Sequence, residues 1–292
     1  MQEYTEKELE QIHGINLEMS KYFVDFCLKH DLLCYFCGGG CIGAIRHKGF
    51  IPWDDDLDFF MPREDYEKLY DLWISEPNER YAICKPSEDM VDHNVFITIR
   101  DTHTTLIKPY QQDLDMPHGV VLDIFPLDGY PSSKFARKMQ CFWALIYSLF
   151  CAQLVPVNHG KAIGLLGKTA LGIFRGKKIR YRIWKMAEKH MSKYRICECE
   201  GITELCAGPG YMKNRYPKKA FEKAIFVDFE DCKMPIPIGY DDYLKIAFGD
   251  YMQLPPPEKR KSHHDCVILD CENSYEIYRG KYFCVGRKEE KQ

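Results

Sequence analysis

Apolar residues recur along this chain with two periods, and the changes between the periods mark the predicted elements. Thr5 and Glu8 form a capping-box pattern at the start of a helical repeat, whose apolar positions are Leu9, Ile12, Met19, Phe23 and Phe26. The short run "LLCYFC" predicts a buried strand that enters a tight turn at the glycines behind it. The segments that follow predict a short helix over "CIGAIRH", a strand over "LDFFM" and a helix over "REDYEKLYDLW" that Pro62 opens.

The rest of the pattern divides the chain into three regions. Further strands are expected over "YAICK", "NVFITIRD", "TLIKP" and "GVVLDIFPLDG", the last of them closed by an Asp-Gly turn. Residues 132–200 are helical in pattern, and the tail returns to short strands ("ITELCAG", "IFVDF") and one helix, "YDDYLKIAFGDY". We therefore predict an α+β protein with a catalytic core over 1–131, a helical basic insert over 132–200 and a C-terminal segment, 201–292, that packs back on the core.

The stretch "GFIPWDDDLDFFMP" places four aspartates directly beside apolar residues. Two like charges ~4 Å apart cost roughly 4 kcal/mol at an effective dielectric of ~20, so something must offset the repulsion. On an extended segment Asp54, Asp56 and Asp58 share one face, and Asp123 is a lone acid inside the apolar run "VVLDIFPL". These carboxylates predict a site for Mg²⁺, with Mn²⁺ as the alternative ion. For Asp55, a metal ligand and a solvated turn remain equal interpretations.

A glycine run, Gly38, Gly39 and Gly40, precedes the short helix. Backbone N–H groups at such a helix start can approach a phosphate, although any tight turn also uses glycine. Arg46 and Lys48 follow the helix and could reach a diphosphate, or be ordinary surface charges.

The long stretch "GGGCIGAIRHKGFIPWDDDLDFFMPREDYEKL" resembles the signature of the LicD family of phosphotransferases, and "GVVLDIFPLDGYP" and "FGDYMQLPPPEKRKSHH" are similar to other stretches of that family. The resemblance implies a nucleotidyltransferase-like mixed β-sheet flanked by helices. It implies that Asp56 and Asp58 hold Mg²⁺, that Asp123 supplies a third carboxylate and that Gly39 and Gly40 line the phosphate site. One departure is that Gly40 and Cys41 stand where a hydroxyl residue is expected.

The implied reaction moves a phosphorylated alcohol, such as phosphocholine, from a CDP-linked donor to a sugar hydroxyl of a cell-surface glycan precursor. We expect Asp123 to act as general base. A basic patch in the tail is expected to close over the leaving phosphate, or to be plain polar surface: Lys259, Arg260, Lys261, His263 and His264. Arg100 and Asp101 are read as site residues or as a buried ion pair. Trp53 or Tyr110 could box a quaternary ammonium. The alternatives are a nucleotidyltransferase that releases pyrophosphate from an NTP and a non-catalytic membrane- or glycan-binding module.

Charge and cysteine content change this picture in two respects. The net charge of −3 argues against nucleic acid as a partner. Residues 161–195, however, hold eleven lysines and arginines against one acid, interleaved with apolar residues, which fits a membrane-surface helix or a solvated face packed on the core. The apolar run 141–157 is too short and interrupted to span a bilayer.

The N-terminus lacks the pattern of a secretory signal, and fourteen cysteines then favour a reducing compartment. We expect a cytoplasmic enzyme, peripheral on the inner face of the membrane in one interpretation. Zinc at Cys34-x-x-Cys37, or at Cys197, Cys199 and Cys206, is a weak alternative because residues i and i+3 of a strand face opposite sides. The transferred alcohol, the acceptor sugar and the oligomeric state stay open.

Overall fold

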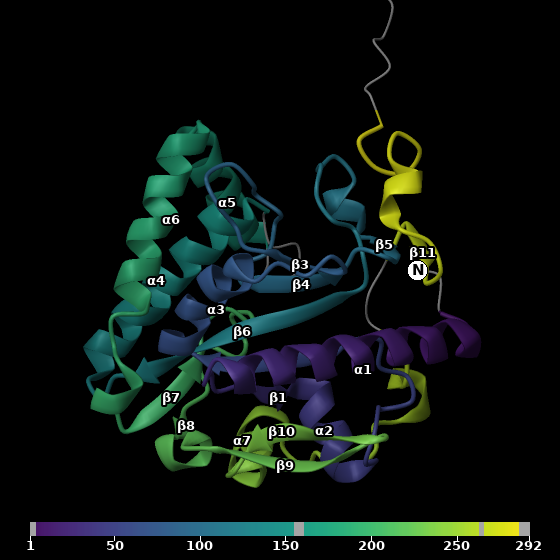
Figure 1. The fold of residues 1–292 in the computed structure, drawn as a ribbon. Helices are drawn as coiled ribbons and strands as arrows, with labels where there is room; N and C mark the ends of the chain where they lie inside the picture. Colours follow the sequence, from purple (N-terminus) through teal and green to yellow (C-terminus); the bar gives the residue numbers. More distant parts are fainter. Residues whose placement is uncertain (1–3, 155–160, 263–265, 286–292) are drawn as a thin grey trace, which may run out of the picture.

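The computed structural model describes residues 4–154, 161–262 and 266–285. Helices and strands alternate along the first half of the chain, and a run of helices follows (Figure 1). The α-helices are α1 (Glu6–Lys29), α2 (Gly38–Arg46), α3 (Arg63–Ser75), α4 (Lys134–Ala152), α5 (Lys161–Ile173), α6 (Lys177–Met191) and α7 (Tyr240–Phe248). The predicted α+β class is therefore confirmed.

A mixed sheet forms the centre of the molecule, with the strand order β1-β2-β6-β4-β3. Strand β7 pairs with the far half of β6, and β8 pairs with β7. Only β2 and β6 pair in parallel; the other neighbours in this sheet are antiparallel. Its strands are β1 (Tyr35–Cys37), β2 (Asp58–Pro62), β3 (Tyr81–Cys84), β4 (Ile97–Asp101), β6 (Val121–Tyr130), β7 (Gly201–Glu204) and β8 (Tyr216–Pro217).

Strand β6 continues through the position where the sequence pattern predicted a turn. The Asp-Gly pair, Asp128 and Gly129, lies inside the strand and does not close it, because β7 continues the ladder beside both residues. Asp128 is buried in a bidentate ion pair with Arg63, at 2.7 and 2.9 Å. Gly129 is required by close packing, since a Cβ atom there would lie 2.5 Å from the carbonyl oxygen of Tyr194.

The main core lies between this sheet and α1, which runs along it (Figure 1). The predicted capping box begins α1: the Thr5 side chain accepts from the Glu8 N–H and Glu8 accepts from the Thr5 N–H. Helix α2 begins at Gly38, three residues earlier than predicted. Gly38 itself has a φ of +50°, a conformation that glycine adopts at little cost, and this turns the chain from β1 into α2.

Helices α4 and α6 pack on each other around a second apolar cluster, which includes Ala144, Phe150, Trp184 and Met191. These helices and α5 gather at one end of the molecule (Figure 1). None of the described helices is long and apolar enough to cross a membrane.

The tail contributes two small two-stranded sheets besides β7 and β8. Strands β9 (Ala224–Phe229) and β10 (Cys232–Pro237) pair with each other beside β1 and α2. Strand β11 (Ile268–Asp270) pairs with β5 (Thr105–Ile107), so residues 266–285 lie at the end of the molecule away from α4 and α6 (Figure 1).

Candidate functional site

Two aspartates that are 65 positions apart in the chain lie side by side in the sheet. The parallel register of β2 and β6 places Asp58 directly opposite Asp123. Neighbouring strands are about 4.8 Å apart, so both carboxylates share one small region at the same end of the two strands. On the other side of β2, Asp58 is opposite Cys37, the residue that precedes the glycine run.

Both aspartates have an unsatisfied buried oxygen. The Oδ1 atoms of Asp58 and Asp123 are buried and have no hydrogen-bond partner among the described residues. Burial and then the nearby charges of Asp56, Asp123 and Asp54 raise the pKa of Asp58 well above its usual value. Buried polar atoms are normally paired, so oxygens left open in this way suit a cation that the side chains would coordinate.

The acidic segment that precedes β2 has no regular secondary structure, since the strand begins only at Asp58. Burial still alternates along it: Asp55 and Leu57 are buried, whereas Asp54, Asp56 and Asp58 are half-buried. One ligand oxygen from each of Asp54, Asp55 and Asp56 lies within 4.8 Å of the others, so Asp55 belongs to the cluster as much as its neighbours do. Each of these three side chains has an interaction partner of its own.

Helix α1 holds this acidic segment in place. The His13 side chain lies 2.7 Å from the carbonyl oxygen of Asp54, and the Asn16 amide donates to the carbonyl of Asp55 at 3.3 Å. Burial lowers the pKa of His13, and its ring stacks on Phe50. The signal in the sequence is a pair of polar residues on the buried side of α1, which our sequence analysis did not use.

The glycine run lies against the acids. A Cβ atom on Gly39 would come within 1.9 Å of the Asp54 Oδ2 atom, so a larger residue there would force the Asp54 carboxylate to move. Gly38 donates its N–H to the Tyr243 hydroxyl at 3.0 Å, and the start of α2 has no side-chain cap. Cys41 is fully buried, so the departure from the family pattern adds a core residue and no polar group to this helix start.

Lys108, which our sequence analysis did not single out, supplies a cation beside the carboxylates. It lines a cavity of about 20 Å³ with Asp55, Asp56 and Asp123. That volume is enough for a water molecule or an ion. Burial lowers the pKa of Lys108, but Asp123 and Asp56 are among the groups that raise it, and the pKa stands above its ordinary value.

Arg100 and Asp101 do not form the ion pair that one interpretation of the sequence expected. They are consecutive on β4 and therefore point to opposite faces of the sheet. Asp101 pairs with Arg80, with a closest contact of 2.7 Å. Arg100 is fully buried and donates to Thr98 and Gln111, both at 3.3 Å, while its Nη1 atom has no partner among the described residues.

Two of the predicted phosphate-binding cations lie near the acidic segment. Arg46 donates to the carbonyl of Tyr251 at 2.7 Å; burial and then the charge of Arg260 lower its pKa, and Asp54 raises it. The Arg260 guanidinium lies over the Trp53 ring, 5.5 Å from the ring centre.

The other predicted cations are more scattered. Lys48 is exposed and close enough to Asp228 of β9 to help lower the pKa of that carboxyl, after Lys233. Lys259 is exposed in a short 3-10 helix. His263 and His264 lie outside the described residues. Tyr110 adjoins Lys108 in the chain and its side chain is partly exposed.

In the described part of the chain, the cysteines form no cluster that could hold zinc. The only cluster of three or more possible metal-ligating residues found there is Asp54, Asp55 and Asp56. Cys34 is buried and its neighbour is Cys27, whose pKa is raised by burial and then by a hydrogen bond with Cys34.

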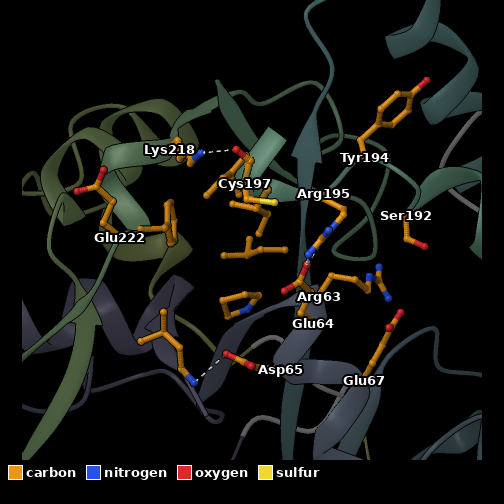
Figure 2. Close-up of a pocket in the computed structure, with 16 residues that line it drawn as sticks. Arg63, Glu64, Asp65, Glu67, Ser192, Tyr194, Arg195, Cys197, Lys218 and Glu222 are labelled. Atoms are coloured by element: carbon orange, nitrogen blue, oxygen red, sulfur yellow. Dashed lines mark hydrogen bonds and ion pairs between the residues drawn. The ribbon is translucent and has the colours of Figure 1, made fainter. Parts of the chain in front are cut away.

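A larger cavity, of about 580 Å³, lies at the opposite end of the same strands. Pro62 and Leu127 line it, four positions along β2 and β6 from Asp58 and Asp123. Figure 2 shows its charged rim, where Arg195 pairs with Glu64 and Lys218 donates to the carbonyl of Cys197. Four residues of strand span about 13 Å, so this cavity is separate from the carboxylate site.

Comparison with known proteins identifies the family of this chain. The family described as "LicD/FKTN/FKRP, nucleotidyltransferase domain" matches residues 32–144, which include the glycine run, the acidic segment, Lys108 and Asp123. The chain is 30% identical over 259 residues to the lipopolysaccharide cholinephosphotransferase LicD of Haemophilus influenzae, an alignment that covers 85% of this chain and 92% of that protein. A similarity that extends over almost the whole of both chains shows that this protein is an enzyme of the LicD family of phosphotransferases.

Proposed function

We propose that this enzyme transfers phosphocholine from a CDP-linked donor to a sugar hydroxyl of a cell-surface glycan, with Mg²⁺ at the aspartate cluster. The observation that carries the proposal is the pairing of Asp58 with Asp123 inside the matched domain, each with a buried oxygen that has no hydrogen-bond partner in the described part of the chain. The choice of choline and of a glycan acceptor rests on the Haemophilus relative, whose name states both a cholinephosphotransferase activity and lipopolysaccharide.

The donor set suits magnesium. Asp56, Asp58 and Asp123 would hold the ion, with Asp54 or Asp55 as further oxygen ligands, and Mn²⁺ could take the same place. A bound divalent ion would neutralise the donor diphosphate and relieve the repulsion among the carboxylates. Burial first, and then the charges of Asp56, Asp123 and Asp54, raise the pKa of Asp58, and a bound cation would favour the charged form of this carboxylate.

The other residues of the site would orient the donor and take the proton. Amides at the start of α2 would meet a phosphate, and Lys108 would stabilise charge on the phosphoryl oxygens. The acceptor oxygen would form a bond to the phosphorus that carries choline. The bond from that phosphorus to CMP would break, with its electron pair leaving on CMP, and the hydroxyl proton would pass to the Asp123 carboxylate.

The cationic alcohol needs a partner of its own. Arg260 already lies over Trp53, and Tyr110 is partly exposed next to Lys108, so we assign the choline contact to Tyr110. Arg46 and Arg260 would be available to the diphosphate on the side of Asp54.

We place the enzyme in the cytoplasm, at the inner face of the membrane. All fourteen cysteines are free thiols, which suits a reducing compartment. A lipid-linked glycan would be a suitable acceptor at that location.

The test uses purified enzyme with CDP-choline, with or without Mg²⁺, and measures both thermal stability and release of CMP. We expect stabilisation by CDP-choline only when the metal is present, and CMP release that needs an acceptor glycan. Asp58→Asn and Lys108→Met should each reduce turnover at least a hundredfold, whereas Asp25→Asn, an exposed acid on α1, should leave it unchanged. Pyrophosphate release from an NTP, with no response to CDP-choline, would overturn the proposal in favour of nucleotidyl transfer.

A further inference from the structure

Helix α5, the turn after it and the first turn of α6 expose a row of large apolar side chains. The exposed fractions are 66% for Leu165, 71% for Leu166, 68% for Ile173, 44% for Phe174 and 49% for Ile179. Single exposed apolar residues are common, but five along one short segment form a surface that usually meets a partner.

The segment is anchored on its other side. Leu171 is buried in the second apolar cluster, and Phe174 contacts Phe150 of α4 with ring centres 5.8 Å apart. Arg180 fixes the turn through the carbonyls of Leu171 and Phe174, at 2.8 and 3.0 Å, and through the Gln153 side chain at 2.6 Å. The apolar row is therefore the outer face of a structured element.

Charge on this segment has one sign. From residue 161 to residue 187 the sequence contains no aspartate or glutamate. The described cations whose side chains are exposed here are Lys168, Arg175, Lys177, Lys178, Arg182 and Lys185. Of these, Lys177 pairs with Asp89 and Lys185 with Glu188. Protein partners usually meet such cations with discrete acids, whereas a plane of anionic headgroups over an apolar layer complements both features at once.

We infer that α5 and the α5–α6 turn form a docking surface for a bilayer that contains anionic phospholipid. The helix lies in the plane of the headgroups, with Leu165, Leu166 and Ile173 entering the acyl boundary and the cations contacting lipid phosphates. The inference deepens the proposed location at the membrane, because it names the surface that docks and the class of lipid that it meets, and it does not depend on which donor the enzyme uses.

The first measurement is co-sedimentation of the full-length enzyme with vesicles of phosphatidylglycerol and phosphatidylcholine, compared with vesicles of phosphatidylcholine alone. We expect binding to the anionic vesicles, at least tenfold weaker binding to the neutral ones, and a loss of binding as salt is raised. Equal partition into both kinds of vesicle, or into neither, would overturn the inference.

Two variants locate the surface. Leu166→Ser combined with Ile173→Ser tests the apolar row, and Lys168→Glu combined with Arg175→Glu tests the cations; each should weaken vesicle binding at least tenfold. The matched controls are Phe226→Ser combined with Ile277→Ser, which are exposed apolar residues elsewhere, and Lys219→Glu. Controls that lose binding to the same extent would contradict the assignment.

Light scattering and donor binding separate the other outcomes. If the wild type is a dimer that the Leu166→Ser and Ile173→Ser changes dissociate, the row belongs to a second copy of the chain and the membrane inference is wrong. Both variants should keep the wild-type melting temperature and its response to CDP-choline with Mg²⁺. If the proposed reaction is wrong, the wild type itself will not respond to CDP-choline, whereas an error in this inference changes only vesicle binding.

Discussion

At the scale of single residues, Gly39 is the position where one methyl group would collide with the acidic cluster. An alanine Cβ atom would lie 1.9 Å from the Asp54 carboxylate oxygen, so that carboxylate would have to move. We expect Gly39→Ala to lower turnover at least tenfold and to weaken the stabilisation by Mg²⁺. Metal titrations followed by thermal shift, together with CMP release, measure both effects.

Gly14 provides the control for this substitution. It lies within α1, and a Cβ atom there would meet nothing within 4 Å. Gly14→Ala should leave turnover unchanged and stabilise the protein by about 1 kcal/mol, the usual gain inside a helix. Full activity and metal response in the Gly39→Ala variant would show that the acidic segment does not need this close contact.

At the scale of elements, β7 carries a buried acid whose titration contributes to stability. Burial raises the pKa of Glu204 to about 7, although hydrogen bonds from Tyr216 and Asn214 oppose the shift. The folded pKa is above the unfolded value, so the folded state binds this proton more tightly. The resulting stability is fully present below the unfolded pKa of 4.5 and is lost as the pH rises through about 7.

Glu204→Gln tests this linkage. The substitution keeps the side chain neutral, so the variant should lose less stability than the wild type between pH 5 and 8, with a difference of roughly 2–4 kcal/mol. Denaturant unfolding at several pH values measures it, and Glu222→Gln, an exposed acid, is the control. Parallel pH profiles for the wild type and Glu204→Gln would show that Glu204 titrates normally.

The predicted elements were correct where a short window contains their cause. The capping box at Thr5 begins a helix and the run "LDFFM" forms a strand, both as predicted. Helix capping and the spacing of apolar residues depend on neighbours in the chain, so a short window is enough to predict them. The prediction of a turn at the Asp-Gly pair was wrong, because a distant strand, β7, and the ion pair with Arg63 hold these residues in an extended strand.

At the scale of the whole molecule, the C-terminal segment packs against the part of the chain that carries Lys108. The Val267 N–H donates to the Ile107 carbonyl at 2.8 Å, the Tyr275 N–H to Thr104 at 3.1 Å, and the Cys284 N–H to Gln112 at 2.8 Å. Residues from the end of the chain thus support the element next to the carboxylates.

Val267→Pro should loosen this support, because proline removes the N–H that bonds to Ile107. We expect faster amide exchange over residues 104–112 and a higher KM for CDP-choline, without loss of the main core. Hydrogen exchange and steady-state kinetics measure these effects. Val267→Ala keeps the N–H and should behave as wild type; equal effects of the two substitutions would mean that the side chain, and not the strand pairing, is what matters.

Some properties of this protein follow from the sequence alone. The spacing of apolar residues predicts the α+β class. Acids crowded beside an apolar strand predict a cation site, because the repulsion among the carboxylates must be offset whatever the rest of the fold is. The glycine run and the acidic segment are close in the chain, so their association was also foreseeable.

Only the tertiary structure decided which distant groups meet. The parallel pairing of β2 with β6 sets Asp58 against Asp123, the path after β5 brings Lys108 to the same cavity, and α1 holds the acidic segment through His13 and Asn16. The pattern of apolar and polar residues along the chain indicates which side of a helix or strand is buried. It does not indicate which other element packs against that side. Strand order and register depend on contacts between residues far apart in the chain, and for this reason the composition of the site became visible only in the folded molecule.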